Sequence, residues 1–295
     1  MRDVVILNCP SNLGLREPYP GHEPGVRKLP AWLRKHGLHD KLKPVMDITV
    51  EAPAYSGVRD EESGLLNVPA LRMYTQKLAG EMEMHLQGNK VIWMLGGDCS
   101  ILTGAALALR REGRFGLFYL DGHTDFMDIR LSSTGGAGGM AASLVAGRGY
   151  EGLTKLDGFK NYIDEPLIWC VGNREYDDEY ESEVRNSEAT YYPLHAMRAR
   201  GMVSLAMDFL DQMNNENVDG FWIHFDVDVL NDNIMPCVDS RTPDGLSYEE
   251  LTDILGTLFI HPRFTGITLT ILDPELDTDE KYTRELVKVL GKFKF

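Results

Sequence analysis

Short apolar runs alternate with longer amphipathic segments along this chain, which predicts strand–helix–strand units in a mainly parallel sheet. The apolar runs are rich in β-branched and aromatic residues, which favours strands. The predicted strands are Val4–Leu7, Val91–Leu95, Phe115–Leu120, Pro166–Val171, Phe221–Val227 and Gly266–Ile271. The predicted helices are Val68–Leu86, Ser100–Arg111, Met140–Ala146, Ser204–Asn214, Ser247–Phe259 and Asp279–Leu290. The expected fold class is therefore α/β, a three-layer α/β/α arrangement.

Local signals mark one helix start and one loop. Ser247 and Glu250 have the spacing of a capping box, so a helix is expected to begin there. The segment Pro10–Pro24 is rich in proline and glycine and is expected to be a long loop rather than a linker. No change of composition divides the chain, so we expect a single domain over residues 1–295.

The composition narrows the classes of function. A chain of 295 residues with 43% hydrophobic residues can bury a sizeable core. The formal charge of −15 argues against binding to nucleic acid or to an anionic membrane surface, and leaves metal ions and small cations as partners. The cysteines are widely spaced and contain no CxxC pair, which favours a cytoplasmic, reducing compartment. No apolar run approaches the ~20 residues that a membrane span needs.

Polar, carboxylate-bearing residues directly follow three of the predicted strands. They are GGDCS at Gly96–Ser100, DGHTDF at Asp121–Phe126, and the pair Asp226 and Asp228. Ligands of open α/β sheets bind at the carboxyl ends of the strands, where these residues fall. This coincidence makes that edge of the sheet the expected functional site.

Strand alternation predicts which of these side chains meet. Asp121 and His123 are two residues apart and are expected to point together, with Asp125 following them. Asp226 and Asp228 are expected to share a face with His224, by the same spacing. The expected cluster holds four carboxylates and at least one imidazole.

Four carboxylates at the end of an apolar sheet would repel one another and titrate upward unless cations neutralised them. Two divalent ions would balance the charges of Asp121, Asp125, Asp226 and Asp228. Oxygen ligands with imidazole favour Mn²⁺ among the available ions. A DxD pair on a strand is often a surface feature or a helix cap, but the three carboxylate-bearing motifs together, in this order, indicate a metal site.

These motifs carry a resemblance to a known family. GGDCS, DGHTDF and HFDVDVL, in that order, resemble the three metal-binding motifs of the arginase, agmatinase and formimidoylglutamase superfamily. Gly25–Leu38 resembles the N-terminal helix of that superfamily, and Val171–Glu175 resembles the strand and turn that border its substrate pocket. Val238–Glu250 resembles the loop and helix after its last metal motif. The resemblance covers most of the chain and implies an arginase-like fold.

The resemblance implies a two-metal ligand set. Asp121 and Asp226 would bridge two metal ions, Asp125 would complete the shell of one ion, and His123 with Asp228 that of the other. The implied cofactor is two Mn²⁺ ions. The implied partners are a small-molecule substrate and other copies of the chain, as trimers or hexamers.

The first metal position departs from the family pattern, because Cys99 stands where the family has a histidine, GGDHS. Three interpretations remain open. Cys99 is a thiolate ligand that shifts the site toward Zn²⁺ or Fe²⁺, a neutral thiol beside a weakened or single-ion site, or a redox-sensitive switch.

Two further departures concern the substrate. Gly138 stands at the position of a family histidine that relays protons to the leaving group. Ile271 stands at the position of a glutamate that pairs with the substrate guanidinium, so arginine and agmatine are disfavoured.

His224 is either a substitute proton shuttle or a hydrogen-bonded core histidine under the site. The glycine-rich run Gly135–Gly139 lacks the spacing of a nucleotide motif and is expected to be a mobile pocket loop.

The sequence therefore predicts a metal-dependent hydrolase of a C–N bond in an amidine-like, guanidino or formimidoyl compound. Metal-activated water would attack the planar carbon, with Asp125 and His224 as the catalytic residues and Asp125 carrying the proton to the leaving amine.

Two alternatives remain: a metal-binding pseudoenzyme of the same fold, and a single-metal amidohydrolase similar to histone deacetylases. His22, Arg174 and Glu175 are weaker candidates, expected near the pocket entrance.

Overall fold

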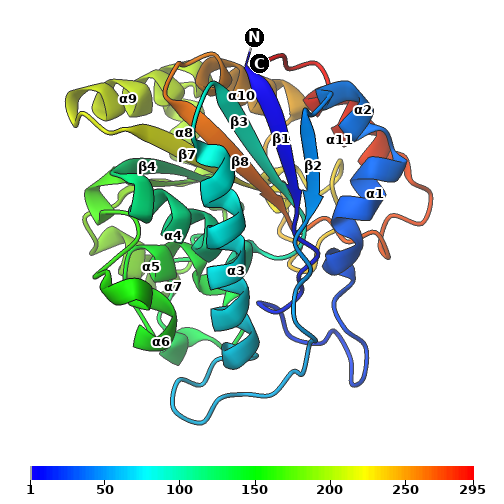
Figure 1. Cartoon of the computed structure of the whole chain (residues 1–295), viewed down its shortest axis with the longest axis vertical. Coiled ribbons are helices and arrows are strands. Elements are labelled where there is room, and N and C mark those ends of the chain that lie inside the picture. Colours follow the sequence, from blue (N-terminus) through cyan, green and yellow to red (C-terminus); the bar gives the residue numbers. More distant parts are fainter. Residues whose placement is uncertain (1) are drawn as a thin grey trace.

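Eight parallel strands form one sheet in the computed structural model, which describes residues 2–295 (Figure 1). The strand order is β2-β1-β3-β8-β7-β4-β5-β6. The strands are β1 (Asp3–Asn8), β2 (Met46–Thr49), β3 (Lys90–Leu95), β4 (Phe115–Leu120), β5 (Ile168–Val171), β6 (Thr190–Tyr192), β7 (Gly220–Asp226) and β8 (Phe264–Thr270). Every neighbouring pair is parallel, so all the carboxyl ends lie at one edge.

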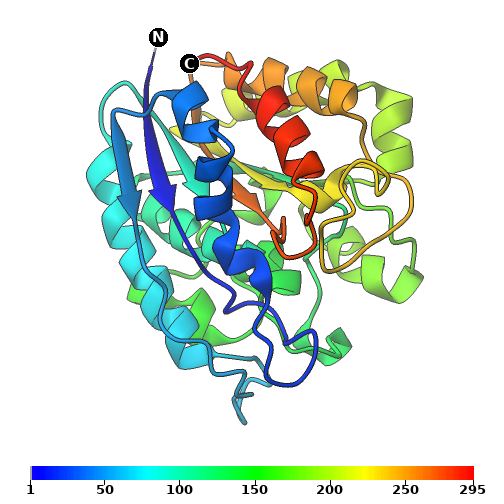
Figure 2. The same cartoon turned by 90° about the vertical axis from the view of Figure 1, so that its right-hand side faces the viewer.

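Helices cover both faces of this sheet, which confirms the predicted three-layer α/β fold. Helices α3, α4 and α5 lie on one face, and α1, α10 and α11 lie on the other (Figures 1 and 2). The helices are α1 (Leu29–Lys35), α2 (Leu38–Leu42), α3 (Val68–Leu86), α4 (Leu102–Glu112), α5 (Ala141–Val145), α6 (Glu151–Thr154), α7 (Asp178–Arg185), α8 (Leu194–Arg200), α9 (Met202–Asn215), α10 (Tyr248–Phe259) and α11 (Lys281–Leu290). No helix within residues 2–295 combines the length and hydrophobicity that crossing a membrane requires.

All six predicted strands are present, and the two that were missed are the edge strands β2 and β6. The central strand β4 is buried along its whole length, so it appears in the sequence as a continuous apolar run. β2 is largely exposed and β6 is half-buried, and neither carries such a run. The predicted strand at 166–171 begins two residues later, because Pro166 lies in a 3₁₀ turn and has no N–H for the ladder.

The predicted helices are also present, with small shifts at their ends. α3 has the predicted bounds, and the helix predicted at 100–111 begins with a 3₁₀ turn, Cys99–Ile101, before α4. The short helices α2, α6, α7 and α8 were not predicted, because few apolar positions define a period over so short a length. The loop at 10–24 contains no helix or strand.

The sheet core is made of apolar side chains that fill the space on both faces. Trp93, Phe118, Phe221 and Trp222 are completely buried. Because the middle strands are rigidly packed in this way, the loops that follow them start from fixed positions. That each residue of 1–295 belongs to one domain stays a prediction.

The capping box at the start of α10 is confirmed. The Ser247 hydroxyl accepts from the Glu250 N–H at 3.1 Å, and the Glu250 carboxylate accepts from the Ser247 N–H at 2.8 Å. We expect Ser247→Ala to lower the free energy of unfolding by about 1 kcal/mol, measured by urea denaturation. Thr257→Ala, in the middle of the same helix, is the control and should cause no loss. Equal stability of Ser247→Ala and the native protein would contradict this account.

Candidate metal centre

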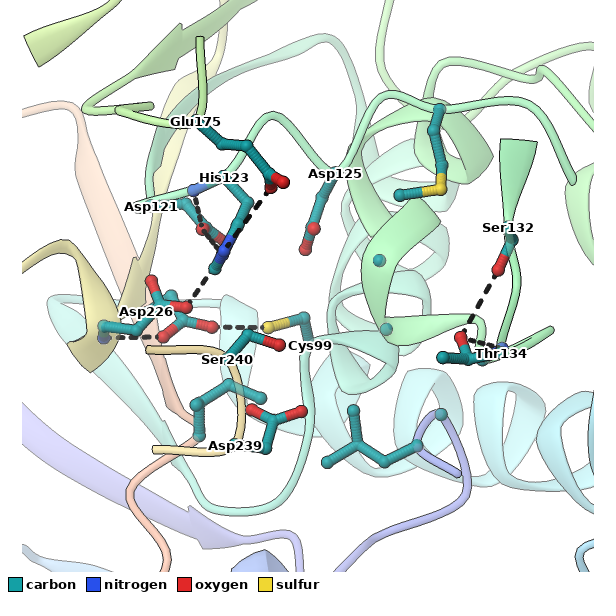
Figure 3. Close-up of a pocket in the computed structure, with 18 of the residues that line it drawn as sticks. Cys99, Asp121, His123, Asp125, Ser132, Thr134, Glu175, Asp226, Asp239 and Ser240 are labelled. Atoms are coloured by element: carbon teal, nitrogen blue, oxygen red, sulfur yellow. Dashed lines mark hydrogen bonds and ion pairs between the residues drawn. The ribbon is translucent and has the colours of Figure 1, made fainter. Parts of the chain in front are cut away.

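The candidate site lies where four adjacent strands in the middle of the sheet end, β3, β8, β7 and β4 (Figure 3). Cys99 opens the 3₁₀ turn after β3, and Thr270 is the last residue of β8. Asp226 is the last residue of β7, and Asp121 directly follows β4. The three motifs that the sequence singled out therefore meet at one edge of the sheet.

Turns, rather than strand alternation, bring the remaining side chains to this edge. β4 ends before Asp121, and the Asp121 carboxylate accepts the N–H of His123 at 2.7 Å. Asp228 lies in a 3₁₀ turn, where its N–H donates to the Asp226 carboxylate at 2.8 Å. Asp125 has a left-handed backbone, with φ of 42°. The expected cluster is present, but the expectation that a continuing strand would build it is wrong.

Two groups of side chains are close enough to hold metal ions. The ligand atoms of Cys99, Asp121, His224 and Asp226 all lie within 4.8 Å of one another. Those of Asp121, His123 and Asp228 do so as well. Asp121 belongs to both groups, so the geometry is that of two adjacent cation positions that share one carboxylate.

Asp125 lines the same cavity but belongs to neither group. Its Oδ2 accepts a hydrogen bond from the hydroxyl of Tyr119 at 2.5 Å, and its carboxylate points toward the cluster (Figure 3). Asp125 is buried, and burial together with the charge of Asp121 raises the pKa of the Asp125 carboxyl well above its usual range. The residue is therefore placed to hold a proton at the side of the cavity.

Burial and neighbouring negative charge also raise the pKa values of Asp121, Asp226 and Cys99. Burial and the neighbouring charge of Asp228 raise the pKa of Asp121 to about 6. Burial, with the charges of Asp228 and Asp121, raises the pKa of Asp226 well above its ordinary value. Burial and the charge of Asp226 likewise raise the pKa of the Cys99 thiol, which donates to Asp226 Oδ2 at 2.8 Å. Each group therefore resists taking a negative charge unless a cation is near.

His123 forms ion pairs with two carboxylates of the cluster. Its Nδ1 is 2.9 Å from Oδ2 of Asp228 and 3.6 Å from Oδ1 of Asp121. Burial by itself would raise the pKa of Asp228, but His123 lowers it overall. Burial would lower the pKa of His123, but Asp228 raises it well above its usual value. Without a metal ion, a protonated imidazole therefore partly occupies the place of a cation.

The two oxygens of each central carboxylate divide their contacts in the same way. One oxygen of Asp121, Asp226 and Asp228 accepts a backbone N–H, that of His123, Asp228 and Gly122 respectively. The second oxygen of Asp226 accepts a hydrogen bond from the Cys99 thiol, and the second oxygen of Asp228 pairs with the His123 ring. The second oxygen of Asp121 is buried and has no hydrogen-bond partner among residues 2–295.

This unpartnered oxygen shows that the residues fit a divalent cation. A buried carboxylate oxygen without a partner is costly, and a metal ion supplies the missing contact. Asp121 is the carboxylate common to both ligand groups, so this residue could contribute to both cation positions. The donor set of carboxylate, imidazole and thiol is one that Mn²⁺, Fe²⁺ and Zn²⁺ accept.

A cavity of about 380 Å³ opens above the cluster. Its floor is formed by Cys99, Asp121 and Asp226, and Ile271 lines it as well. The glycine-rich run, expected to be a pocket loop, lines it through Gly136, Gly138 and Gly139. The mobility of this loop stays a prediction. The cavity is large enough for a small organic molecule above the metal positions.

Of the weaker candidates, Arg174 is closer to the centre than expected. It is 5% exposed, and its guanidinium donates to the backbone carbonyl of Asp228 at 2.6 Å. It thereby supports the turn that carries this carboxylate. Glu175 is half-exposed at the mouth, with its carboxylate 4.0 Å from the His123 ring. His22 pairs with Glu275 and does not line the cavity.

Sequence reasoning missed Tyr119, which connects two parts of the site. Its hydroxyl bonds to Asp125, and its ring stacks on that of His224 with centroids 4.4 Å apart. Tyr119 lies in β4, two residues before Asp121, and this spacing is the sequence signal that could have pointed to it. Tyr180 was also missed, and its hydroxyl accepts the N–H of Thr124 at 2.7 Å.

A profile of the "Arginase family" matches residues 2–292. The chain belongs to the arginase family. The arginase of Staphylococcus aureus (strain MRSA252) is 26% identical to this chain over 300 residues. The alignment covers 99% of this chain and 97% of that arginase. The arginase of Bacillus subtilis (strain 168) is 26% identical over 294 residues, with 98% and 96% covered. Arginase-family proteins are metal-dependent hydrolases of C–N bonds, and the metal-ligand groups described above agree with this.

Solved structures confirm the arginase-like fold. The native arginase of Bacillus caldovelox superposes with a TM-score of 0.88 at 23% identity, covering 99% of this chain and 97% of that one. Formimidoylglutamase from Bacillus subtilis superposes with a TM-score of 0.77 at 18% identity, covering 99% and 85%. The proposed resemblance to the ureohydrolase superfamily is therefore confirmed for this arginase-family chain.

The raised pKa of Asp121 predicts how the metal-free protein responds to pH. The folded pKa of about 6 exceeds the unfolded value of about 3.9, so the carboxyl's contribution to stability is complete below pH 4 and is lost as the pH rises through 6. We expect Asp121→Asn in chelator to raise the free energy of unfolding at pH 7.5 by on the order of 2 kcal/mol, and far less at pH 4.5. Urea denaturation at the two pH values measures this.

The control for this prediction is Asp211→Asn on the exposed side of α9, which should change stability by less than about 0.5 kcal/mol at either pH. A metal-free Asp121→Asn protein that is less stable than the native protein at pH 7.5 would contradict the electrostatic account of the cluster.

Proposed function

We propose that this chain hydrolyses a C–N bond in a small amidine-like, guanidino or formimidoyl compound, with divalent metal ions as cofactors. The observation that carries the proposal is the buried, unpartnered oxygen of Asp121 at the floor of the cavity. A carboxylate shared by two ligand groups is suited to two adjacent ions. Membership of the arginase family supports the reaction class.

The proposal divides the residues by role. The metal ligands would be Cys99, Asp121, His123, Asp125, Asp226 and Asp228. Bound divalent ions would supply Lewis acidity and a nucleophilic water at neutral pH. Mn²⁺ is the ion expected from the resemblance, and the thiol of Cys99 favours Zn²⁺ at one position. Asp125, whose pKa burial raises, would hold the proton that the departing amine needs.

The cavity also bears on the substrate, which we propose is not arginine. Ile271 presents an apolar side chain to the cavity, where the family resemblance places a carboxylate. A buried guanidinium would there lack its bidentate partner. Gly138 lines the cavity without an imidazole, so the family's proton relay is absent at that position. A substrate with a smaller or less charged group at the reacting carbon fits these two positions better.

We also propose an assembly from the family resemblance and a location from the state of the cysteines. A trimer or hexamer is proposed from the resemblance alone. A cytoplasmic location is proposed because the four cysteines are free thiols and all are buried. The acidic charge supports a small-molecule partner rather than nucleic acid.

An assay on metal-loaded protein tests the reaction. We expect protein reconstituted with Mn²⁺ or Zn²⁺ to release urea, ammonia or an amine from at least one of a panel of guanidino, formimidoyl and ureido compounds. Chelation should abolish the activity, and the metal content should approach two equivalents. Two bound equivalents without product from any compound would contradict the proposal. Less than one equivalent would indicate the pseudoenzyme of the same fold instead.

Substitution of Ile271 tests the argument about substrate. We expect Ile271→Glu to raise kcat/KM for arginine or agmatine by about 10-fold or more over the native chain, because it provides a carboxylate for the guanidinium. Ile271→Gln has the same shape without the charge and should give no such gain. Efficient cleavage of arginine by the native chain, or equal effects of both variants, would overturn the assignment of Ile271.

A further inference from the structure

Cys99 leaves the first metal position without the histidine of the family motif, and an imidazole reaches the same position from another element. His224 lies on β7, two residues before Asp226. A ring nitrogen of His224 is within 4.8 Å of the Cys99 sulfur and of carboxylate oxygens of Asp121 and Asp226. The position thus has both a thiol from a loop and an imidazole from a strand.

The ring of His224 is held in a fixed orientation. Nδ1 is 2.7 Å from the hydroxyl of Thr268, the residue opposite His224 in the register of β7 and β8. The ring also stacks on Tyr119 at an interplanar angle of 15°. Metal-binding histidines are commonly oriented in this way, by a hydrogen bond from the nitrogen that does not bind the metal.

The other nitrogen, Nε2, has only a weak contact. It lies 3.5 Å from the Thr270 hydroxyl, which in turn is 3.4 Å from the Cys99 sulfur. A separation of 3.5 Å is too long for a strong hydrogen bond. Nε2 therefore lies near Cys99 without a strong hydrogen bond, and in the tautomer with the proton on Nδ1 its lone pair would be available to an ion.

The position of His224 is less suited to a proton shuttle. Its side chain is completely buried, and it does not line the cavity that Cys99, Asp121 and Asp226 line. A proton carrier must reach the substrate or water, whereas a ligand need only reach the ion. His224 is thus close enough to reach an ion at Cys99, Asp121 and Asp226, but it does not reach the cavity.

We propose that His224 is a metal ligand and that Cys99 and His224 together hold the first ion with Asp121 and Asp226. This inference rests on the proposed metal-dependent function and reassigns His224 from catalysis to coordination. Cys99 would lose its thiol proton to solvent as the thiolate binds. Thiolate, imidazole and carboxylate are all ligand types that zinc binds. The position of Asp121, His123 and Asp228 has no sulfur ligand and therefore suits Mn²⁺ better.

X-ray absorption on zinc-loaded protein tests this assignment without changing His224. In the His123→Gln variant, His224 is the remaining imidazole of the two ligand groups. We expect one equivalent of zinc in that variant to show a sulfur at ~2.3 Å and an imidazole nitrogen at ~2.0 Å. Sulfur without imidazole, or no zinc bound to the variant, would overturn the inference.

Cobalt substitution gives a second measurement with matched variants. We expect Co²⁺ to give a near-ultraviolet thiolate charge-transfer band that Cys99→Ser abolishes. His224→Gln should retain this band, change the visible ligand-field bands and weaken Co²⁺ binding by more than about 100-fold, beyond the effect of losing an outer-shell partner. His39→Gln, a buried histidine bonded to Asn8, is the control and should leave spectrum and affinity unchanged.

These outcomes separate the inference from the function on which it rests. Unchanged spectra and affinity in His224→Gln, with catalysis intact, would overturn the ligand role of His224 and leave the hydrolase proposal standing. Failure of the native chain to bind Zn²⁺, Co²⁺ or Mn²⁺ at all would overturn both.

Discussion

The structure depends on the repulsion among carboxylates held at one edge of a rigid sheet. Asp121, Asp226 and Asp228 each use one oxygen to fix a backbone turn, which commits the other oxygen to the centre of the cluster. Because these turns start from buried parallel strands, the carboxylates cannot separate without disturbing the core. Folding therefore produces a site of concentrated negative charge, and a cation relieves it. The repulsion lowers the free energy of unfolding of the metal-free protein, and its relief contributes to the affinity for a metal ion.

Much of this arrangement could be predicted from the sequence. The buried strands β3, β4, β7 and β8 are apolar runs bounded by polar motifs, and parallel pairing brings their ends together. The edge strands β2 and β6 could not be found in this way, since exposure removes the apolar signal. The details of the turns were also beyond reach, because they depend on side chain to backbone hydrogen bonds rather than on a period.

Contacts between distant residues limited the prediction of individual roles. The sequence spacing placed His224 near Asp226 but did not show that its ring lies against Tyr119 and Thr268 and does not line the cavity. Arg174 was expected near the pocket entrance, yet it is buried against the backbone of Asp228. Both facts depend on which strands are neighbours in the sheet. The strand order cannot be read from local patterns.

The departures from the family pattern converge on one cavity and have a common physical effect. Cys99, Gly138 and Ile271 all line it, and each replaces a polar or charged group by a softer or apolar one. Ile271 has φ of 78°, a left-handed conformation that is costly for a β-branched residue, so the surrounding structure must hold it in place. A residue kept there against backbone strain contributes its apolar shape to the lining of the cavity.

In the proposed coordination, an imidazole on a strand would take the place of one on a loop. A ligand on β7 inherits the rigidity of the sheet, and its partner Thr268 is fixed by the register of the neighbouring strand. Cys99, in contrast, lies in the turn that follows β3. In the proposed coordination, His224 would bind the first ion from a strand and Cys99 would bind it from a turn. The open side then remains directed at the cavity, where a substrate must bind for any hydrolysis to occur.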